Sequence, residues 1–183
     1  MDTNKQTSKN IVLIGFMGVG KTSAGKVLAN KLDRQFVDTD EQIEKEMNMP
    51  TATIFEALGE SAFRKKEKEV ILTLCDKQNG TIISPGGGAF LQQEIREACL
   101  SSSIVIFLDL SWEAWQERLP EIFDSRPVLH DKSVEEMKQL FNERKKLYEQ
   151  NYHVRIAIDQ LSIEETAQQM ITALRKSESS TIH

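Results

Sequence analysis

The residues with the clearest chemical signature are Gly15–Thr22, Gly-Phe-Met-Gly-Val-Gly-Lys-Thr, directly after the apolar run Ile11–Ile14. In this spacing the glycines let successive backbone N–H groups turn toward a phosphate without clashes from Cβ atoms. The helix predicted at Ala24–Leu32 directs its positive end at the same point. The alternative is a glycine-rich turn from strand to helix without a ligand. We favour a nucleotide site in which the lysine reaches the β- and γ-phosphates and the threonine serves Mg²⁺. The predicted ATP-binding residues of this loop are Gly18, Val19, Gly20, Lys21, Thr22 and Ser23.

Two carboxylates, Asp38 and Asp40, follow the predicted strand Gln35–Val37. Beside a phosphate loop, one carboxylate of such a pair can order Mg²⁺ through water. The other can accept the proton of a substrate hydroxyl and direct the oxygen at the γ-phosphorus. The alternative is a simple strand exit in which Asp40 is the N-cap of the next helix.

A glycine triplet, Gly86, Gly87 and Gly88, follows the predicted strand Thr81–Ser84. Three successive glycines are costly in conformational entropy, so a plain loop is better served by other residues. The triplet therefore indicates that a ligand approaches the backbone closely, with a flexible linker as the alternative.

Three arginines complete the candidate site. Arg144 falls on the apolar face of the helix predicted over Ser133–Tyr152, where a guanidinium needs an anionic partner; an internal salt bridge is the alternative. Arg64 lies near the start of its helix, where a cation opposes the helix dipole unless a negative group is present; a solvated face is the alternative. Arg126 lies in an aperiodic segment, residues 119–133, which we predict to be a lid; an exposed loop charge is the alternative.

The elements that position these residues alternate between strand and helix along the chain. This alternation predicts an α/β fold in which a five-stranded parallel sheet is covered by helices on both faces, as in P-loop NTPases of the nucleoside monophosphate kinase type. Ligands bind beyond the carboxyl ends of such strands, where the loop, the aspartates and the glycine triplet all lie. The predicted strands are Ile11–Gly15, Gln35–Val37, Thr81–Ser84, Ile104–Leu108 and Val154–Ile158.

Length and composition favour one domain. The chain has 183 residues, 39% of them hydrophobic and 28% charged. We expect a single kinase domain at residues 10–175, with a substrate-binding insert at about 40–78, a lid at about 120–133, and disordered tails at 1–9 and 176–183. The net charge of −5 argues against a nucleic-acid binder, and no apolar stretch approaches the length of a membrane span.

Cysteine and histidine usage points to a reduced, cytoplasmic setting. Cys75 and Cys99 sit beside apolar residues in helical patterns, which fits buried thiols better than a disulfide. The histidines show no ligand spacing with one another or with the cysteines, so Mg²⁺ accompanying the nucleotide is the expected metal.

The order of these pieces resembles the shikimate kinases over nearly the whole ordered chain. The resemblance implies transfer of the γ-phosphoryl group of ATP to the 3-hydroxyl of shikimate, a step of chorismate and aromatic amino acid biosynthesis, by a monomer. The motifs that carry it are Gly15–Thr22, Phe36–Asp40 with Ile43-Glu44, Phe63-Arg64, Gly86–Gly88, Arg126-Pro127 and Arg144.

The same resemblance implies a role for each motif. Asp40, Arg64, the glycine triplet and Arg144 hold shikimate, with both arginines on its carboxylate and Asp40 on its hydroxyls. Thr22 and Asp38 serve Mg²⁺, and Arg126 closes with the lid onto the ATP phosphates. The predicted catalytic residues are Asp40, Lys21 and Arg126.

Some positions depart from the family pattern. Pro85 precedes the triplet where leucine is usual, and Val128-Leu129 replaces a leucine pair. Arg118 is the candidate contact for adenine, by position only. Two other activities fit parts of the pattern: another small-metabolite kinase, such as a gluconate kinase, or a nucleotide-gated binding protein without catalysis.

Overall fold

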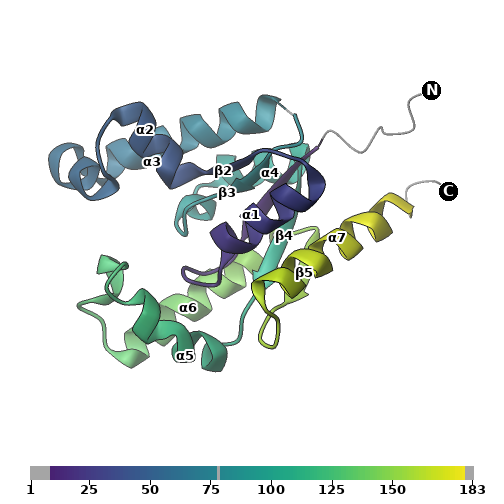
Figure 1. Ribbon diagram of the computed structural model, residues 1–183. Helices are drawn as coiled ribbons and strands as arrows, with labels where there is room; N and C mark the ends of the chain where they lie inside the picture. The colour runs from purple at the N-terminus through teal and green to yellow at the C-terminus, as the bar shows by residue number, and fades with distance from the viewer. Residues whose placement is uncertain (1–8, 78, 180–183) are drawn as a thin grey trace.

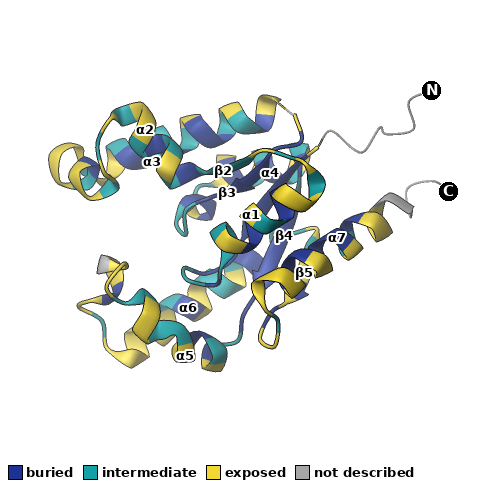
Figure 2. Cartoon of the chain, in the orientation of Figure 1, coloured by how far each residue is buried: buried dark blue, intermediate teal, exposed yellow. Residues whose placement is uncertain are grey.

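A parallel sheet of five strands forms the centre of the computed structural model, which describes residues 9–77 and 79–179. Its strand order is β2-β3-β1-β4-β5, and each predicted strand is confirmed with its ends shifted by at most one residue. The three central strands, β1, β3 and β4, are buried because helices cover both faces of the sheet, and they are dark blue in Figure 2, whereas the edge strands β2 and β5 are less buried. The strands are β1 (Asn10–Ile14), β2 (Phe36–Asp38), β3 (Ile82–Ser84), β4 (Ser103–Asp109) and β5 (Val154–Ala157).

Helices cover the sheet on both sides. Helix α1 (Lys21–Leu32) packs beside α7 (Ile163–Ser179) on one face, while α4 (Gln93–Ser102) packs on β4 at the other face (Figure 1). Because β1 lies between β3 and β4, the chain changes direction across the sheet at β1. In folds of this type the ligand site lies at that switch point, beyond the carboxyl end of the strand.

The predicted substrate-binding insert is an arm of two helices with a small core of its own. Helices α2 (Thr39–Met47) and α3 (Thr51–Lys77) pack together, and α3 is broken at Gly59, whose φ is 83°. Since left-handed backbone is tolerated best by glycine, the break falls where the sequence allows it. The buried residues between the two helices are Ile43, Ile54, Phe63 and Val70.

The predicted lid differs from expectation at its beginning. We expected an aperiodic segment from Leu119, but helix α5 (Trp112–Ile122) continues through Pro120 to Ile122. Pro120 cannot donate the backbone hydrogen bond to the Gln116 carbonyl, so α5 lacks one bond in its last turn and continues for only two more residues. Two elements follow: a short 3₁₀ segment (Pro127–Leu129) and then α6 (Val134–Glu149), which begins with the predicted capping box at Ser133.

Both ends of the predicted domain can be compared with the structure. Of the predicted tails at 1–9 and 176–183, residues 1–8 and 180–183 lie outside the described residues. Helix α7 continues to Ser179, so residues 176–179 are helical where we expected a disordered tail. Cys75 and Cys99 are buried free thiols, as predicted. Among the helices described, none is long and apolar enough to cross a bilayer.

Candidate active site

The phosphate loop joins β1 to α1 and has the backbone shape that its glycines predict. Gly15, Gly18 and Gly20 have φ angles of 154°, 77° and 97°, a region that side chains with a Cβ rarely enter. Lys21 Nζ donates hydrogen bonds to the carbonyl oxygens of Gly15, at 2.7 Å, and Phe16, at 3.2 Å. Burial, and to a lesser degree the charge of Arg126, lowers the pKa of Lys21 to about 8. The Lys21 ammonium group is therefore bound to carbonyl oxygens of its own loop, and these do not fully compensate for the burial of its charge.

Helix α5 holds the loop from outside. The indole Nε1 of Trp115 donates to the Met17 carbonyl at 2.8 Å, and Arg118 Nη1 donates to the Val19 carbonyl at 3.1 Å. Arg118, predicted to contact adenine, is thus placed against the loop itself. A Cβ atom at Gly18 would lie 2.5 Å from Cδ1 of Ile122, so a side chain there would also require Ile122 to move.

Asp38 and Thr22 meet at the side of the loop. The Thr22 hydroxyl donates to Asp38 Oδ2 at 2.8 Å, while Asp38 Oδ1 accepts the N–H groups of Asp40 and Glu41. Asp38 is therefore the N-cap of α2, and the alternative that gave this role to Asp40 is wrong. Because Thr22 donates its proton to Asp38, its lone pairs remain available to a cation, and both residues offer the oxygen ligands that Mg²⁺ prefers.

Within the part of the chain that the structure describes, one oxygen of the Asp40 carboxyl group is buried without a hydrogen-bond partner. Its Oδ1 atom is buried and accepts no hydrogen bond from the described residues. Burial, followed by the negative charge of Asp38, raises the pKa of the Asp40 carboxyl, and the positive charges of Arg126, Lys21 and Arg64 oppose this rise. A carboxylate with a raised pKa and a free lone pair is suited to accept a proton.

Gly86 and Gly88 leave space for neighbouring side chains, and no glycine of the triplet has a left-handed φ angle. The left-handed φ angles among the described glycines occur elsewhere in the chain. A Cβ at Gly86 would lie 2.6 Å from Asp40 Oδ1, and one at Gly88 would collide with the Arg64 guanidinium. The alternative of a flexible linker is wrong, because the triplet begins a hydrogen-bonded turn in which the Ala89 N–H donates to the Gly86 carbonyl at 3.0 Å. The groups that approach this backbone include two predicted substrate-binding residues.

Arg64 is held by a buried carboxylate. Its Nη1 lies 2.8 Å from Glu67 Oε2, and its Nε lies 3.6 Å from Glu60. The side chain of Glu67 is 0% exposed, and burial raises its pKa while the Arg64 hydrogen bond opposes that rise. The alternative of a solvated face is wrong for Arg64, since a negative group does face it, as the dipole argument required.

Arg144 lacks the internal partner that its alternative interpretation demanded. Its Nη1 is buried without a hydrogen bond, and within residues 9–77 and 79–179 no carboxylate forms an ion pair with it. The adjacent Lys145 does form one, with Asp109 at 2.9 Å. An inward guanidinium without a partner is costly to bury, which favours an anionic ligand over an internal salt bridge.

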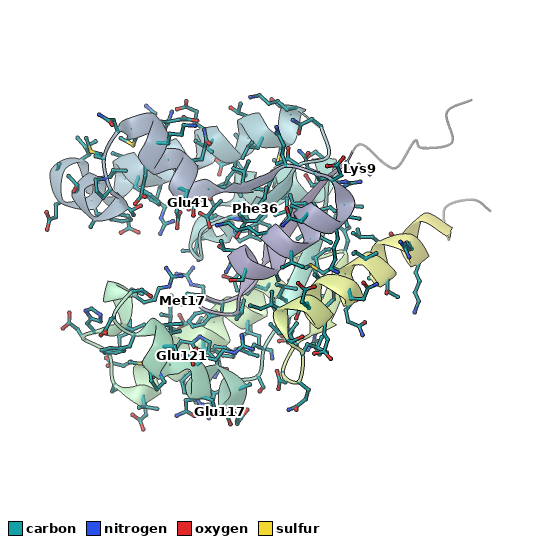
Figure 3. The ribbon with its side chains drawn as sticks, viewed as in Figure 1. Lys9, Met17, Phe36, Glu41, Glu117 and Glu121 are labelled. Carbon is teal, nitrogen blue, oxygen red and sulfur yellow. The ribbon has the colours of Figure 1, made fainter. Side chains whose placement is uncertain are left out.

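Arg126 connects the predicted lid to the loop electrostatically. The residue is exposed and lies just before the short 3₁₀ segment. Its charge nevertheless lowers the pKa values of both Lys21 and Asp40, so it acts on the centre of the site. In Figure 3, Glu41 of α2 and Glu121 of α5 lie on opposite sides of Met17, with the phosphate loop between the arm and the lid.

Comparison with known proteins agrees with this geometry. The family described as shikimate kinase matches residues 17–175. The chain belongs to the shikimate kinase family. This membership confirms the resemblance and the kinase class predicted from the sequence.

Relatives and solved structures give the extent of the similarity. The shikimate kinase of Bacillus subtilis strain 168 is 52% identical over 167 residues, covering 91% of this chain and 89% of the relative. The structure titled shikimate kinase from Acinetobacter baumannii in complex with shikimate aligns with a TM-score of 0.83 at 31% identity, over 92% of this chain and 94% of that one. A gluconokinase from Sinorhizobium meliloti, at 17% identity and a TM-score of 0.54, shares only the fold.

Sequence reasoning missed a set of buried polar residues behind the site. Glu67 and Tyr148 lie one turn after Arg64 and Arg144 on the same helices, and both are buried. The signal that was available is a polar residue within an apolar stripe, since Glu67 recurs with Phe63 and Val70 at helical spacing. A buried polar side chain needs a hydrogen-bond partner. Glu67 accepts a hydrogen bond from Arg64, and the Tyr148 hydroxyl donates to the Gly87 carbonyl.

Proposed function

We propose that the chain transfers the γ-phosphoryl group of ATP to the 3-hydroxyl of shikimate, giving shikimate 3-phosphate and ADP. One observation carries the proposal: Asp40 Oδ1 and Arg144 Nη1 are both buried and unpartnered, and each belongs to a helix that contacts the glycine triplet. An acceptor and a cation in one site call for a substrate that bears both a hydroxyl and an anionic group. Shikimate has a carboxylate and three hydroxyls, and family membership supports it as that substrate.

Asp40 and the arginines bind and activate the acceptor. Arg64 and Arg144 bind the carboxylate, and the space left by Gly86 and Gly88 is occupied by the side-chain ends of Asp40 and Arg64. Asp40 accepts the proton of the attacking hydroxyl as its oxygen approaches the γ-phosphorus. Its raised pKa makes it a stronger base than an exposed aspartate.

The phosphate loop stabilises the charge of the transferred group. Lys21 exchanges its bonds to the Gly15 and Phe16 carbonyls for the phosphate oxygens, and the loop N–H groups bind the same oxygens. Arg126 adds a further positive charge when the lid closes and excludes water, which limits hydrolysis of ATP. Catalysis is mostly positioning and charge neutralisation.

Thr22 and Asp38 would hold Mg²⁺. The Thr22 hydroxyl has lone pairs free for the cation, and Asp38 Oδ2 lies 2.8 Å from that hydroxyl. The ion, when bound with ATP, neutralises charge that develops on the β- and γ-phosphates.

A coupled ADP-release assay tests the proposal. We expect turnover with shikimate, ATP and Mg²⁺, and little turnover when gluconate or a nucleoside monophosphate replaces shikimate. Equal turnover with gluconate would assign the site to a broader kinase. ADP release in no condition, with ATP binding intact, would favour a nucleotide-gated binding protein.

A further inference from the structure

We propose that residues 86–92, here called the glycine segment, set the positions of Asp40, Arg64 and Arg144 relative to one another through three side chains, Thr39, Gln92 and Tyr148. The inference rests on the proposed function and adds positioning residues to it. Each of the three links joins the segment to a different element that carries a substrate-binding residue.

The first link is to the arm helix α2. The N–H of Gly86 donates to Thr39 Oγ1 at 3.2 Å, and Thr39 is 0% exposed. Thr39 immediately precedes Asp40, whose Oδ1 faces the same glycine. A displacement of the segment at Gly86 would therefore change the position of Asp40, the proposed base, and the atoms that surround its carboxyl group.

The second link is to α3. Gln92 Nε2 donates to Glu67 Oε2 at 3.0 Å and to the Arg64 carbonyl at 3.2 Å. The same Glu67 oxygen accepts the hydrogen bond from Arg64 Nη1. Gln92 thus fixes both the backbone of Arg64 and the carboxylate that orients its guanidinium. Because Glu67 Oε1 has no partner among the described residues, Oε2 provides the hydrogen bonds that hold this carboxylate.

The third link is to α6. The Tyr148 hydroxyl donates to the Gly87 carbonyl at 3.0 Å, and burial raises the pKa of Tyr148 to about 12, so the hydroxyl keeps its proton. Tyr148 lies one helical turn after Arg144, on the same buried face. Gly87 is the one residue of the triplet whose Cβ position is open, with Met17 Cβ 4.0 Å away. Helix α6 therefore contacts Gly87 through its carbonyl oxygen, and this contact does not depend on the absence of a side chain.

These contacts share one pattern. The arm ends at Lys77 and α6 begins only at Val134, and each reaches the glycine segment beside its own substrate-binding residue. A short, hydrogen-bonded segment in contact with all three elements can hold their side chains in one geometry before the substrate arrives. Preorganisation of this kind improves binding because less order is lost on association.

Tyr148→Phe is the sharpest test, because it removes one hydroxyl and keeps the ring in the core. We expect the KM for shikimate to rise roughly three- to tenfold, the loss of one hydrogen bond, with kcat changed by less than about twofold. The dissociation constant for MgADP should not change. Tyr152→Phe is the matched control, since the Tyr152 ring packs on the same Phe107 ring, and it should leave both constants as in the wild type.

Gln92→Met tests the second link with a side chain of similar length that cannot donate. We expect the same pattern: a higher KM for shikimate, a smaller change in kcat and unchanged MgADP binding. Gln93→Met is the control, because the amide of Gln93 donates only to the exposed Glu97, away from the site.

The outcomes of these experiments distinguish a failure of this inference from a failure of the proposed function. If the wild type turns over shikimate and both variants lower the melting temperature while keeping the wild-type KM, the links are merely structural and the inference is overturned. A loss of MgADP binding equal to the loss of shikimate binding would also overturn it. If the wild type itself fails to use shikimate, the proposed function fails, and this inference falls with it.

Discussion

The phosphate loop consists of consecutive residues, Gly15 to Thr22, whereas the acceptor site takes side chains from α2, α3, α6 and the glycine segment. In the loop the working groups are mostly backbone N–H groups, and Lys21 is satisfied by carbonyls of the same loop. In the acceptor site the working groups are side chains, and Asp40 and Arg144 each have a buried atom without a partner. Local sequence is thus enough for the first site, while the second depends on tertiary packing.

The difference also concerns stability. In the loop, two carbonyl oxygens accept hydrogen bonds from Lys21 and offset part of the cost of burying its charge, a cost that shows in its pKa of about 8. Buried polar atoms without partners do cost folding free energy, and an acceptor site that keeps them is maintained for binding. The two regions should therefore respond differently to substitution: the loop should lose activity with modest change in stability, and the acceptor site should in places gain stability when function is removed.

Asp40→Asn should give the largest loss, roughly 10²- to 10⁴-fold in kcat, because the amide cannot accept the hydroxyl proton. Stability should change in the opposite direction. The raised pKa of Asp40 means that the folded state binds its proton more tightly than the unfolded state, so the ionised form costs stability at neutral pH. We expect a higher melting temperature for the variant at pH 7. Glu41→Gln, at an exposed neighbouring carboxylate, is the control for both measurements.

The same shift predicts the acid limb of the wild-type activity profile. Activity with shikimate should fall as the pH drops through the raised pKa of Asp40, above the usual range of an aspartate, because the protonated carboxyl cannot act as a base. An acid limb at the position of an ordinary exposed aspartate would contradict the burial argument.

Lys21→Ala should lower kcat by roughly 10²- to 10³-fold, since it removes a preorganised charge at the transferring group. In the wild type, nucleotide binding should also weaken as the pH rises through about 8, where Lys21 loses its proton. Calorimetry with ADP measures this dependence. Lys26→Ala, on the exposed side of the same helix, removes a surface pair of 3.9 Å and should behave as the wild type.

Arg64 and Arg144 differ in their partners: Arg64 pairs with the buried Glu67, whereas Arg144 Nη1 has no hydrogen-bond partner among the described residues. Each alanine variant should weaken shikimate binding by about 2–5 kcal/mol while MgADP binding persists. Arg64→Ala should also lower the melting temperature, because it leaves the buried Glu67 without its cation. Arg144→Ala should leave the melting temperature unchanged or raise it, with Lys146→Ala as an exposed control on the same helix. A large loss of stability in Arg144→Ala, with shikimate affinity intact, would support an internal structural role after all.

The lid joins the two regions and should show a smaller effect. Arg126→Ala should lower kcat by about tenfold or more and raise the KM for shikimate by less, because its charge acts at the transferring group only when the lid closes. Hydrogen exchange at residues 120–133 should slow when MgADP and shikimate are both bound. Equal protection in the free and bound protein would mean a static loop.

His153 offers a small effect outside both regions. Its Nδ1 accepts the Val105 N–H at 3.0 Å, and burial, followed by the charge of Lys9, lowers its pKa. A histidine whose folded-state pKa is lowered contributes stability above its unfolded pKa of about 6.5 and loses it as the pH falls. We expect the free energy of unfolding to fall as the pH drops below about 6.5. His153→Asn should reduce this pH dependence, which thermal melts at several pH values would measure.

The sequence was sufficient for elements with local signals. All five strands and the burial of the cysteines followed from periodicity, and the capping boxes at the starts of α6 and α7 followed from the patterns Ser133-Val-Glu-Glu136 and Ser162-Ile-Glu-Glu165. The end of α5 was predicted less well, because a proline usually ends a helical pattern, yet Pro120 lies within the last turns. The choice of Asp38 rather than Asp40 as N-cap depended on where the strand stopped, which differed from prediction by one residue.

The acceptor site could be predicted only in part. Its charged residues stood out, since an arginine on an apolar face needs an explanation. The residues that orient them did not, because Gln92 and Thr39 are ordinary in composition and their contacts are made with segments far away in the chain. The role of the glycines was also specified by tertiary packing: the atoms that occupy the space beside Gly86 and Gly88 belong to Asp40 and Arg64.

The bond from Trp115 to Met17 has a practical consequence. The chain has two tryptophans, and both stand on α5, with their rings stacked at 5.3 Å. One donates to the Met17 carbonyl in the phosphate loop, and the helix that carries both leads directly into the predicted lid. Tryptophan emission therefore originates at the junction of the loop and the predicted lid, and it should respond, without an added label, to any ligand that moves either of them.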